Sequence, residues 1–479
     1  MRKRNAWSML PPLAVCALLA GWVALSVASE RAVSFSIVVF AVANLIVYTD
    51  AVDFALRLYM RRRHTAAAGG FIASGQRGHT SINLESFLPI GSQRLVCTAP
   101  FAIIASVFNL EDEVDDFMAA FAMYRERMWL ISDGSTDNTV MRLRQAGWRC
   151  FDDGTNRRKP GAIRRLLERL PAHIDTVLVI DPDVRIRGVN AGSAIDLEQF
   201  VSDFQQSGAA AACPRIMIEP DGFLARFQAF EYALAFRLGR ESLANFSITS
   251  GGVSLYRRSA LERALSRHSL SVYAEDLENA VIMLAAGEHI YYDGRLVVST
   301  EGPGSVRRWF SQRVGWYHGL LKVYSERFPE ILRIGRRGPF AFYHYVLYVG
   351  GLSLALHMVK LVSAVLLLLS LLSGLDALLL GDLIPGGSLV NPANFVAAVS
   401  SYLALGLIAL FTCVPREERA YVAPIVPLYL CYALTHIAPM TVGFANYFAL
   451  KLFHRRLYQD HYESPTAPAG AGIAGKVLQ

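Results

Sequence analysis

Apolar runs long enough to cross a lipid bilayer stand near both ends of this chain, and they restrict its fold more than any other feature. A spanning helix needs about 20 mostly apolar residues, and the runs at 9–28 and 33–52 have that length. Backbone polar groups inside a bilayer must bond within the protein, so such segments form helices. Only Glu30 and Arg31 separate the two runs, which predicts a transmembrane hairpin over residues 1–66.

The C-terminal part contains further apolar runs at residues 340–372, 395–414 and 421–453. We assign the C-terminal transmembrane helices to residues 341–457. The last run is too long for one upright span and contains prolines, so we expect two short or tilted segments that meet near His436. The prediction is six spans, with five as the alternative. A signal peptide is the competing interpretation of the first run.

Basic residues gather beside these runs and contribute to a net charge of +7. An excess of Lys and Arg marks the cytoplasmic flanks of membrane helices. We therefore expect a multi-pass protein of the cell (inner) membrane whose middle region is cytoplasmic. No basic stripe carries interleaved aromatic residues, so we expect no nucleic-acid partner. The clusters that support this orientation are Arg2–Arg4, Arg61–Arg63, Arg333–Arg337 and Lys451–Arg456.

The middle region, residues 67–315, is predicted to be a soluble α/β domain. It opens with a linker rich in Gly, Ala and Ser, after which apolar strands alternate with helical patterns. That alternation is typical of a mostly parallel sheet covered by helices. The expected strands are residues 101–108, 129–132 and 177–180, and the expected helices include residues 137–146 and 277–286.

Acidic residues follow two of the expected strands directly. Asp133 comes after one strand, and Asp181 and Asp183 come after another. Ligands of such sheets bind beyond the carboxyl ends of the strands, so these side chains should share one edge. Alternate residues of an extended segment lie on one side, which suits Asp181 and Asp183 to a hard cation such as Mg²⁺ or Mn²⁺. Each motif by itself is also compatible with a plain turn or a helix cap.

Two more motifs follow along the chain. Glu275 and Asp276 open a helical run, where a carboxylate can act as a general base or simply stabilise the helix start. Gln312, Arg313 and Trp316 supply an amide, a cation that could neutralise a diphosphate, and an aromatic face for a sugar ring.

Residues 316–340 are less apolar than a span, and their apolar residues recur at helical spacing. We expect an amphipathic helix at the membrane surface, with a core-facing helix as the alternative. Residues 458–479 are expected to form a flexible tail.

In this order, the motifs resemble those of the membrane-embedded family 2 glycosyltransferases, which include the cellulose, chitin and hyaluronan synthases and bacterial exopolysaccharide synthases. The resemblance covers most of the chain, and it departs from the family pattern at Gly315, where the family has Arg. The corresponding segments are Ala105–Glu111, Asp133–Ser135, Lys159–Ala162, Asp181–Asp183, Ser250–Gly252 with Arg257–Arg258, Glu275–Asp276, and Gln312–Trp316 with Gly319.

The resemblance implies a Rossmann-like glycosyltransferase (GT-A) domain inserted between transmembrane helices. It also implies inverting transfer from a nucleotide-diphospho-sugar, expected to be UDP-linked, onto a growing β-linked polysaccharide that crosses the membrane. Catalysis falls to Asp276 as base, with Glu275. The implied donor-binding residues are Asn109, Glu111, Asp133, Lys159, Asp181 and Arg313; the acceptor-binding residues are Gly251, Gly252, Gln312 and Trp316; the metal ligands are Asp181 and Asp183.

Two other functions stay open at this point. One is the addition of a single sugar to a lipid acceptor, and the other is transport regulated by a nucleotide-binding domain. The transporter alternative predicts several ionisable residues inside the spans, whereas few are found. The sequence names neither the sugar nor its linkage.

Overall fold

The computed structural model describes residues 41–74, 99–270, 273–379 and 392–458. The strands are β1 (Phe101–Val107), β2 (Met128–Ser132), β3 (Cys150–Phe151), β4 (Thr176–Ile180), β5 (Arg185–Ile186), β6 (Ala211–Ile218), β7 (Val253–Arg257) and β8 (Ile290–Thr300). The helices up to the last strand are α3 (Leu45–Ser74), α4 (Val114–Phe121), η3 (Ala122–Arg127), α5 (Thr139–Gln145), α6 (Arg158–Leu167), η4 (Val189–Ala191), α7 (Leu197–Ser207), α8 (Gly222–Leu234), η5 (Ala235–Arg240), α9 (Arg258–Arg267) and α10 (Glu275–Ala285).

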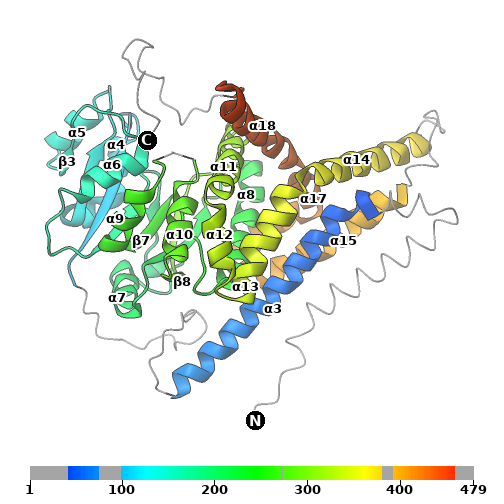
Figure 1. Ribbon diagram of the computed structural model, residues 1–479, viewed down its shortest axis with the longest axis horizontal. Helices are drawn as coiled ribbons and strands as arrows, with labels where there is room; N and C mark the ends of the chain where they lie inside the picture. The colour runs from blue at the N-terminus through cyan, green and yellow to red at the C-terminus, as the bar shows by residue number, and fades with distance from the viewer. Residues whose placement is uncertain (1–40, 75–98, 271–272, 380–391, 459–479) are drawn as a thin grey trace.

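The helices after β8 form the second part of the molecule. They are α11 (Val306–Glu326), α12 (Phe328–Gly335), α13 (Pro339–Ala341), η6 (Phe342–Ala355), α14 (His357–Leu379), α15 (Pro392–Thr412), α16 (Arg416–Val422), η7 (Ala423–Leu428), α17 (Tyr429–Thr435) and α18 (Ile437–Phe453). Figure 1 shows α14 and α15 beside α3, in a narrow bundle that extends away from the broad α/β domain.

The eight strands form one mixed sheet in the order β3-β2-β1-β4-β7-β6-β8-β5. Strands β1 to β4 are parallel to their neighbours within that group, β7 is antiparallel to both β4 and β6, and β6 is parallel to β8. The expected strands at 101–108, 129–132 and 177–180 are confirmed as β1, β2 and β4, and the expected helices as α5 and α10.

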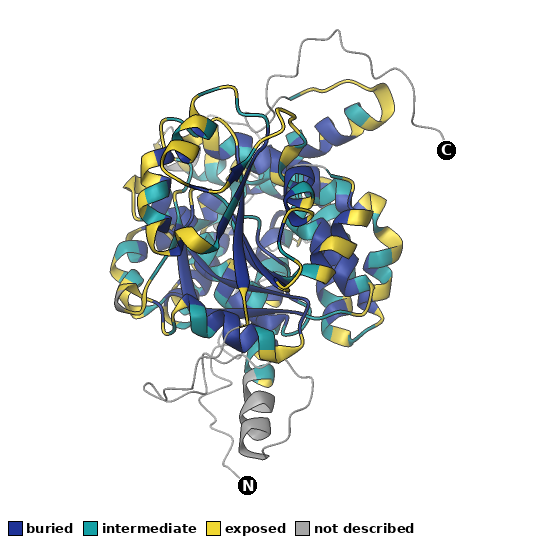
Figure 2. Cartoon of the chain, turned by 90° about the vertical axis from the view of Figure 1, so that its left-hand side faces the viewer, coloured by how far each residue is buried: buried dark blue, intermediate teal, exposed yellow. Residues whose placement is uncertain are grey.

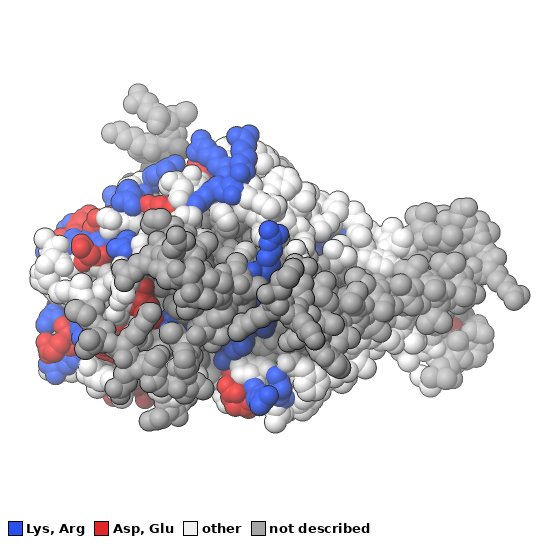
Figure 3. Space-filling view, turned by 90° about the horizontal axis from the view of Figure 1, so that it is seen from below, with Lys and Arg blue, Asp and Glu red and all other residues white. Residues whose placement is uncertain are grey.

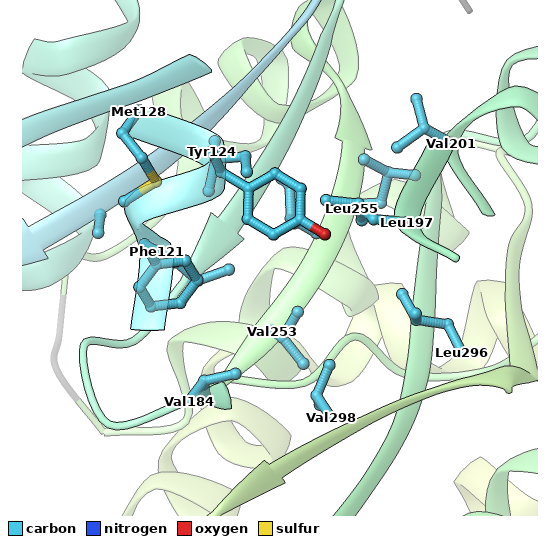
Figure 4. Close-up of a cluster of buried hydrophobic side chains, with 14 of the residues drawn as sticks. Phe121, Tyr124, Met128, Val184, Leu197, Val201, Val253, Leu255, Leu296 and Val298 are labelled. Atoms are coloured by element: carbon cyan, nitrogen blue, oxygen red, sulfur yellow. The ribbon is translucent and has the colours of Figure 1, made fainter. Parts of the chain in front are cut away.

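Apolar side chains cover both faces of the sheet because successive strand residues point to opposite sides. In β1, Ile103 and Ala105 join one buried cluster, whereas Ala102 and Ile104 join the other. Helices α4 and α7 cover the first face, and α6, α9, α10 and α12 cover the second. Figure 2 shows the buried strands inside a shell of helices with exposed outer surfaces, and Figure 4 shows part of the first cluster, including Phe121.

Three helical segments among the described residues are long and apolar enough to cross a membrane: His357–Asp376, Asn394–Thr412 and Arg416–Phe453. In Figure 3, charged side chains gather over the broad part of the molecule, and the described surface of the narrow end is mostly uncharged. The first predicted span lies outside the described residues, as do residues 33–40 of the second. The described helix α3 continues to Ser74, so the predicted linker begins inside a helix.

The apolar run at 340–372 divides at Leu356, which the sequence did not indicate. Its first part is the π-helix η6, where Tyr345 is buried and donates a 2.8 Å hydrogen bond to the backbone oxygen of Phe246. The candidate span therefore begins later than predicted. The run at 421–453 is helical on both sides of His436, where α17 passes into α18 within the single candidate span Arg416–Phe453, so its division into two spans stays a prediction.

The predicted interfacial helix at 316–340 was placed wrongly at its start. Helix α11 begins at Val306, and Trp316 lies in its middle. Val323 and Ile331 are buried in the same apolar cluster as helix α10. The alternative, a core-facing helix, therefore describes the side of α11 and α12 that packs against α10. The apolar cluster there buries Val323 and Ile331.

Candidate active site

Three of the predicted site residues surround the ammonium group of a fourth, Lys159, at the carboxyl end of β4. Lys159 of α6 lies 2.6 Å from Asp181 Oδ1 and 3.0 Å from Glu275 Oε1. Its Nζ also donates a 2.6 Å hydrogen bond to the backbone oxygen of Gly251. The carboxyl end of β4 and the start of α10 thus converge. The sequence predicted the edge position of Asp181 from its strand, whereas only the family resemblance grouped it with Glu275.

The start of helix α10 brings Asp276 beside the same loop. The backbone N–H of Gly251 donates to Asp276 Oδ2 at 3.0 Å, and that of Leu277 donates to Oδ1 at 2.8 Å. A Cβ on Gly251 would lie 3.4 Å from Glu275 Oε1 and 3.9 Å from Asp276 Oδ2, which are ordinary contact distances, so this loop passes directly beside both carboxylates. Gly252 accepts a 2.8 Å hydrogen bond from the Asp181 N–H, which joins the loop to β4. The carboxylate of Asp276 is therefore held in one orientation by backbone donors.

Asp183 lies across from the end of β8, where Thr300 Oγ1 donates to its Oδ2 at 2.7 Å. Among the described residues, no group of three or more His, Cys, Asp and Glu side chains could hold a metal ion. Mg²⁺ commonly binds one or two carboxylates together with phosphate oxygens and water. Asp181 and Asp183 fit a cation that shares its ligands with a diphosphate.

A second group of predicted residues surrounds the loop after β2. The Asp133 carboxylate accepts a 2.6 Å hydrogen bond from the N–H of Arg157. Asn109 accepts one at 2.8 Å from the N–H of Thr136, and Glu111 accepts one at 2.7 Å from Asn138. Asn109 and Glu111 therefore position the loop that follows Asp133.

Strand β1 separates β2 from β4, which places Asp133 about 10 Å from the Lys159 cluster along the same sheet edge. That distance is compatible with one elongated ligand that reaches both groups.

Burial changes the acid–base properties of this edge. It raises the pKa of Asp133 to about 6, although the backbone N–H groups of Arg157 and Arg158 oppose the change. Burial acts to lower the pKa of Lys159, but the Asp181 and Glu275 carboxylates outweigh it and hold the pKa above its ordinary value. Lys159 is therefore a permanent cation at neutral pH.

The third group lies on helix α11, where Arg313 is 1% exposed. Its Nη2 donates to Glu231 Oε2 of α8 at 2.7 Å, and its Nη1 donates to Gln312 Oε1 at 2.9 Å. Burial acts to raise the pKa of Glu231, but the Arg313 guanidinium, His436 and the Tyr432 hydroxyl together outweigh it and leave the pKa below its ordinary value. Arg313 is thus paired with groups of the protein, and its predicted role toward a diphosphate stays a prediction.

Glu231 also connects this ion pair to the C-terminal helices. Tyr432 of α17 donates to Glu231 Oε2 at 2.7 Å and accepts from Trp309 Nε1 at 3.0 Å. Tyr317 Oη and His436 Nδ1 share a hydrogen bond of 2.9 Å. Helices α8, α11 and α17 are thus joined by one polar network inside an apolar surrounding.

Trp316 is 42% exposed, and the Arg313 guanidinium covers one face of its ring at 3.9 Å from the centroid. This geometry is a cation–π contact, which restrains the ring. Only the opposite face could stack on a sugar.

Gly319 explains how α11 reaches the start of α10. A Cβ at this position would lie 2.7 Å from Ala274 Cβ and 2.8 Å from the carbonyl carbon of Tyr273. Ala274 has φ +56°, a strained conformation for a residue with a side chain, directly before Glu275. The close contact holds the segment that presents Glu275 and Asp276.

Glu231 and Thr300 were not found by sequence reasoning. Glu231 lies 82 residues from Arg313 along the chain, and it belongs to no recognisable motif. A separate cavity of about 260 Å³ lies between β6 and α16, where Arg215 pairs with Glu418; none of the predicted site residues lines it.

Two glycosyltransferase family models match this chain. A family model described as "Glycosyl transferase family group 2" matches residues 192–434, and one described as "Glycosyl transferase family 2" matches residues 102–265. Together with the sheet order, these matches confirm the predicted Rossmann-like GT-A fold. A search of curated protein sequences gave no match.

Solved structures with a similar arrangement are distant in sequence. One is a mannosyltransferase from Pyrobaculum calidifontis in complex with GDP-Man and Mn²⁺, at 16% identity and a TM-score of 0.48, covering 84% of this chain and 97% of that one. Another is glucosyl-3-phosphoglycerate synthase from Mycobacterium tuberculosis in complex with Mn²⁺, UDP and its product, at 14% identity and a TM-score of 0.30, covering 47% of this chain and 79% of that one. A third is mannosyl-3-phosphoglycerate synthase from Rubrobacter xylanophilus, at 14% identity and a TM-score of 0.31, covering 48% and 75%.

Gly319→Ala should lower the rate of sugar transfer. The new methyl group would overlap the backbone before Glu275 and displace the base, and misplacement by about 1 Å can cost roughly 10²-fold in rate. Gly304→Ala is the control, because nothing lies within 4 Å of the position that its new methyl group would take. Steady-state kinetics of both variants test this, and a wild-type kcat for Gly319→Ala would contradict it.

Glu231→Leu should destabilise the protein by about 3–5 kcal/mol, because it leaves the buried Arg313 cation unpaired. Adding Arg313→Met removes that cation, so the double variant should recover most of the loss. Thermal unfolding of the single and double variants in detergent measures this. A double variant that is no more stable than Glu231→Leu would show that the ion pair does not determine the stability of this region.

Proposed function

This chain belongs to glycosyl transferase family group 2, and on that basis we propose that it is an inverting, processive glycosyltransferase that builds a β-linked polysaccharide. The donor is a nucleotide-diphospho-sugar, proposed to be UDP-linked. The product is proposed to pass across the membrane through the adjoining helices. Membership of this family supports glycosyl transfer in general. The polymer product is the more specific part of the proposal.

The contact of Gly251 with Asp276 and Lys159 carries the proposal. It brings a general base, a permanent cation and two further carboxylates to one sheet edge. Perturbed and paired ionisable groups of this kind are typical of catalytic sites. The loop after β2, with Asp133, supplies a place for the nucleotide on the same edge.

Asp276 would take the proton of an acceptor hydroxyl while the hydroxyl oxygen attacks the anomeric carbon of the donor sugar. A new C–O bond forms on one face, and the bond to the diphosphate breaks on the other, so the nucleoside diphosphate leaves as an anion. The Gly251 and Leu277 N–H groups keep the Asp276 carboxylate in place for this transfer.

Asp181 and Asp183 would hold a divalent cation together with the diphosphate oxygens. Such a cation supplies electrostatic stabilisation of the departing diphosphate. Lys159 adds a fixed positive charge near the same group and keeps Glu275 oriented.

A polymer product is favoured by the way helix α11 sits against α18 (Figure 1). A Cβ on Gly443 of α18 would lie 2.8 Å from the backbone oxygen of Val314, so the two helices are in direct backbone contact. Trp316, on the same helix as Val314, is an exposed aromatic group of this region. A polysaccharide that left the site along α11 would therefore meet an apolar, membrane-type helix at once. Transfer of a single sugar to a lipid is the alternative.

The domain that contains the carboxylates is proposed to face the cytoplasm, where nucleotide sugars are made. The basic clusters beside the apolar runs support this orientation. Six spans remain the proposed total: two before the α/β domain and four after it, where the long candidate Arg416–Phe453 would have to form two of the four. Membrane lipids would surround these helices.

A donor screen on the purified full-length chain tests the function. Release of nucleoside diphosphate from one or more UDP-sugars, dependent on Mg²⁺ or Mn²⁺, is expected. Separation of the product by size then distinguishes a polymer from a glycolipid. No turnover of any nucleotide sugar would contradict the proposal.

Asp276→Asn should reduce transfer by roughly 10²–10⁴-fold while leaving donor binding intact, because the amide cannot accept the proton. Asp116→Asn, on the exposed surface of α4, is the matched control. Transfer rates and UDP affinity are to be measured in both variants. Transfer near the wild-type rate would remove Asp276 from the mechanism.

Trp316→Ala should shorten the product more than it slows hydrolysis of the donor, because it removes the exposed ring that could hold the acceptor sugar. Phe223→Ala removes another aromatic side chain, 62% exposed on α8, and should leave product length unchanged. Sizing chromatography of radiolabelled product measures both. Equal product lengths in all three proteins would argue against the polymer proposal.

Cysteine labelling tests the proposed topology. In a chain whose native cysteines are replaced by serine, a cysteine at Arg333 should react only from the cytoplasmic side. A cysteine at Ser388, in the loop between two predicted spans, should react from the opposite side. Reaction of both from the same side of intact cells would show that the span assignment is wrong.

A further inference from the structure

The Lys159 ammonium uses all its hydrogen-bonding capacity inside the site. Its three partners are Asp181 Oδ1 at 2.6 Å, Glu275 Oε1 at 3.0 Å and the backbone oxygen of Gly251 at 2.6 Å. An ammonium group has three donors, and each has a partner here. The side chain is about one-fifth exposed, and the two carboxylates keep it charged.

This arrangement conflicts with the binding of a free cation at Asp181. The carboxylate that the motif offers to a metal is the same carboxylate that holds Lys159. A divalent ion bonded to Asp181 would stand within a few ångströms of the ammonium, and like charges at such a distance repel strongly in a partly buried site. Metal alone should therefore compete with Lys159.

The rest of the site supplies few further ligands to such an ion. Asp183 is the second carboxylate of the motif, and Thr300 already donates to it. Within the described residues, no cluster of three or more acidic, His or Cys side chains is available to a metal. The remaining ligands must then come from the diphosphate and from water. The diphosphate also brings the negative charge that would separate the two cations.

We propose that Lys159 is a positioning residue that keeps divalent metal off Asp181 until the donor arrives, so that metal and nucleotide diphosphate bind together. The inference rests on the proposed function, because it assumes a diphosphate donor. It explains why one residue contacts Asp181, Glu275 and the Gly251 loop at the same time. Before the donor binds, the ammonium neutralises the carboxylates and keeps the loop in place.

Binding of Mn²⁺ to the full-length chain in detergent, measured by electron paramagnetic resonance with and without UDP, tests this. In the wild type, UDP should tighten Mn²⁺ binding by at least about tenfold, and Mn²⁺ should tighten UDP binding by the same factor. In Lys159→Gln, Mn²⁺ should bind without UDP at least about tenfold more tightly than in the wild type. The factor by which UDP tightens Mn²⁺ binding should therefore be smaller in this variant than in the wild type.

Three variants serve as controls. Lys159→Arg keeps a cation and should bind free Mn²⁺ as weakly as the wild type. Arg165→Gln removes a partly exposed cation from the same helix and should change nothing. Lys159→Gln combined with Asp181→Asn should lose the gained affinity, which would assign the new Mn²⁺ site to Asp181. Thermal unfolding of each variant confirms that it is folded.

Two results would overturn the inference alone. They are wild-type Mn²⁺ binding that is equally tight with and without UDP, and unchanged nucleotide-free affinity in folded Lys159→Gln. A wild-type chain that binds UDP under no condition would contradict the proposed function as well. UDP binding is therefore measured first, and it separates the two failures.

Discussion

A fully buried guanidinium, that of Arg313, determines how the α/β domain sits on the C-terminal helices. A charge taken out of water needs a close counter-charge, and Glu231 supplies it at 2.7 Å. Tyr432 donates to the same carboxylate, so α8, α11 and α17 must keep one relative position for the charge to stay paired. The apolar cluster around this network includes Phe230 of α8 and Ile425 of η7, so apolar packing also joins these helices.

Helix α11 connects the Arg313 ion pair to the candidate active site. Gly319 lets it touch the backbone before Glu275, and Gly443 of α18 touches it from another side. Both contacts exclude even a methyl group, so neither neighbour can move closer without displacing α11. The position of the proposed base therefore depends on α18, which is part of the candidate span Arg416–Phe453. For a polymerase, such coupling would keep the acceptor path and the base in register.

Much of the fold followed from local patterns. Short apolar strands next to helical periodicity predicted β1, β2, β4 and α5, and the acidic residues after those strands do lie at one edge. The errors arose in apolar segments whose side chains pack within the protein in a way that composition does not indicate. The run at 340–372 indicates one span by its composition, yet its first half is a π-helix whose Tyr345 is buried against the α/β domain. The helix that the sequence predicts from Trp316 onward begins at Val306.

The sequence by itself predicted which residues carry the proposed chemistry, and it determined at which strand or helix end each one stands, because those signals are local. Only the tertiary structure decided which other side chains these residues contact. Lys159 joins Asp181 to Glu275, and Arg313 meets Glu231 across 82 residues of chain. Hydrophobic periodicity specifies which face of a helix is buried, but it does not specify which distant charge will lie opposite a buried cation. That choice depends on the packing of α8, α11 and α17 together, so no single segment contains it.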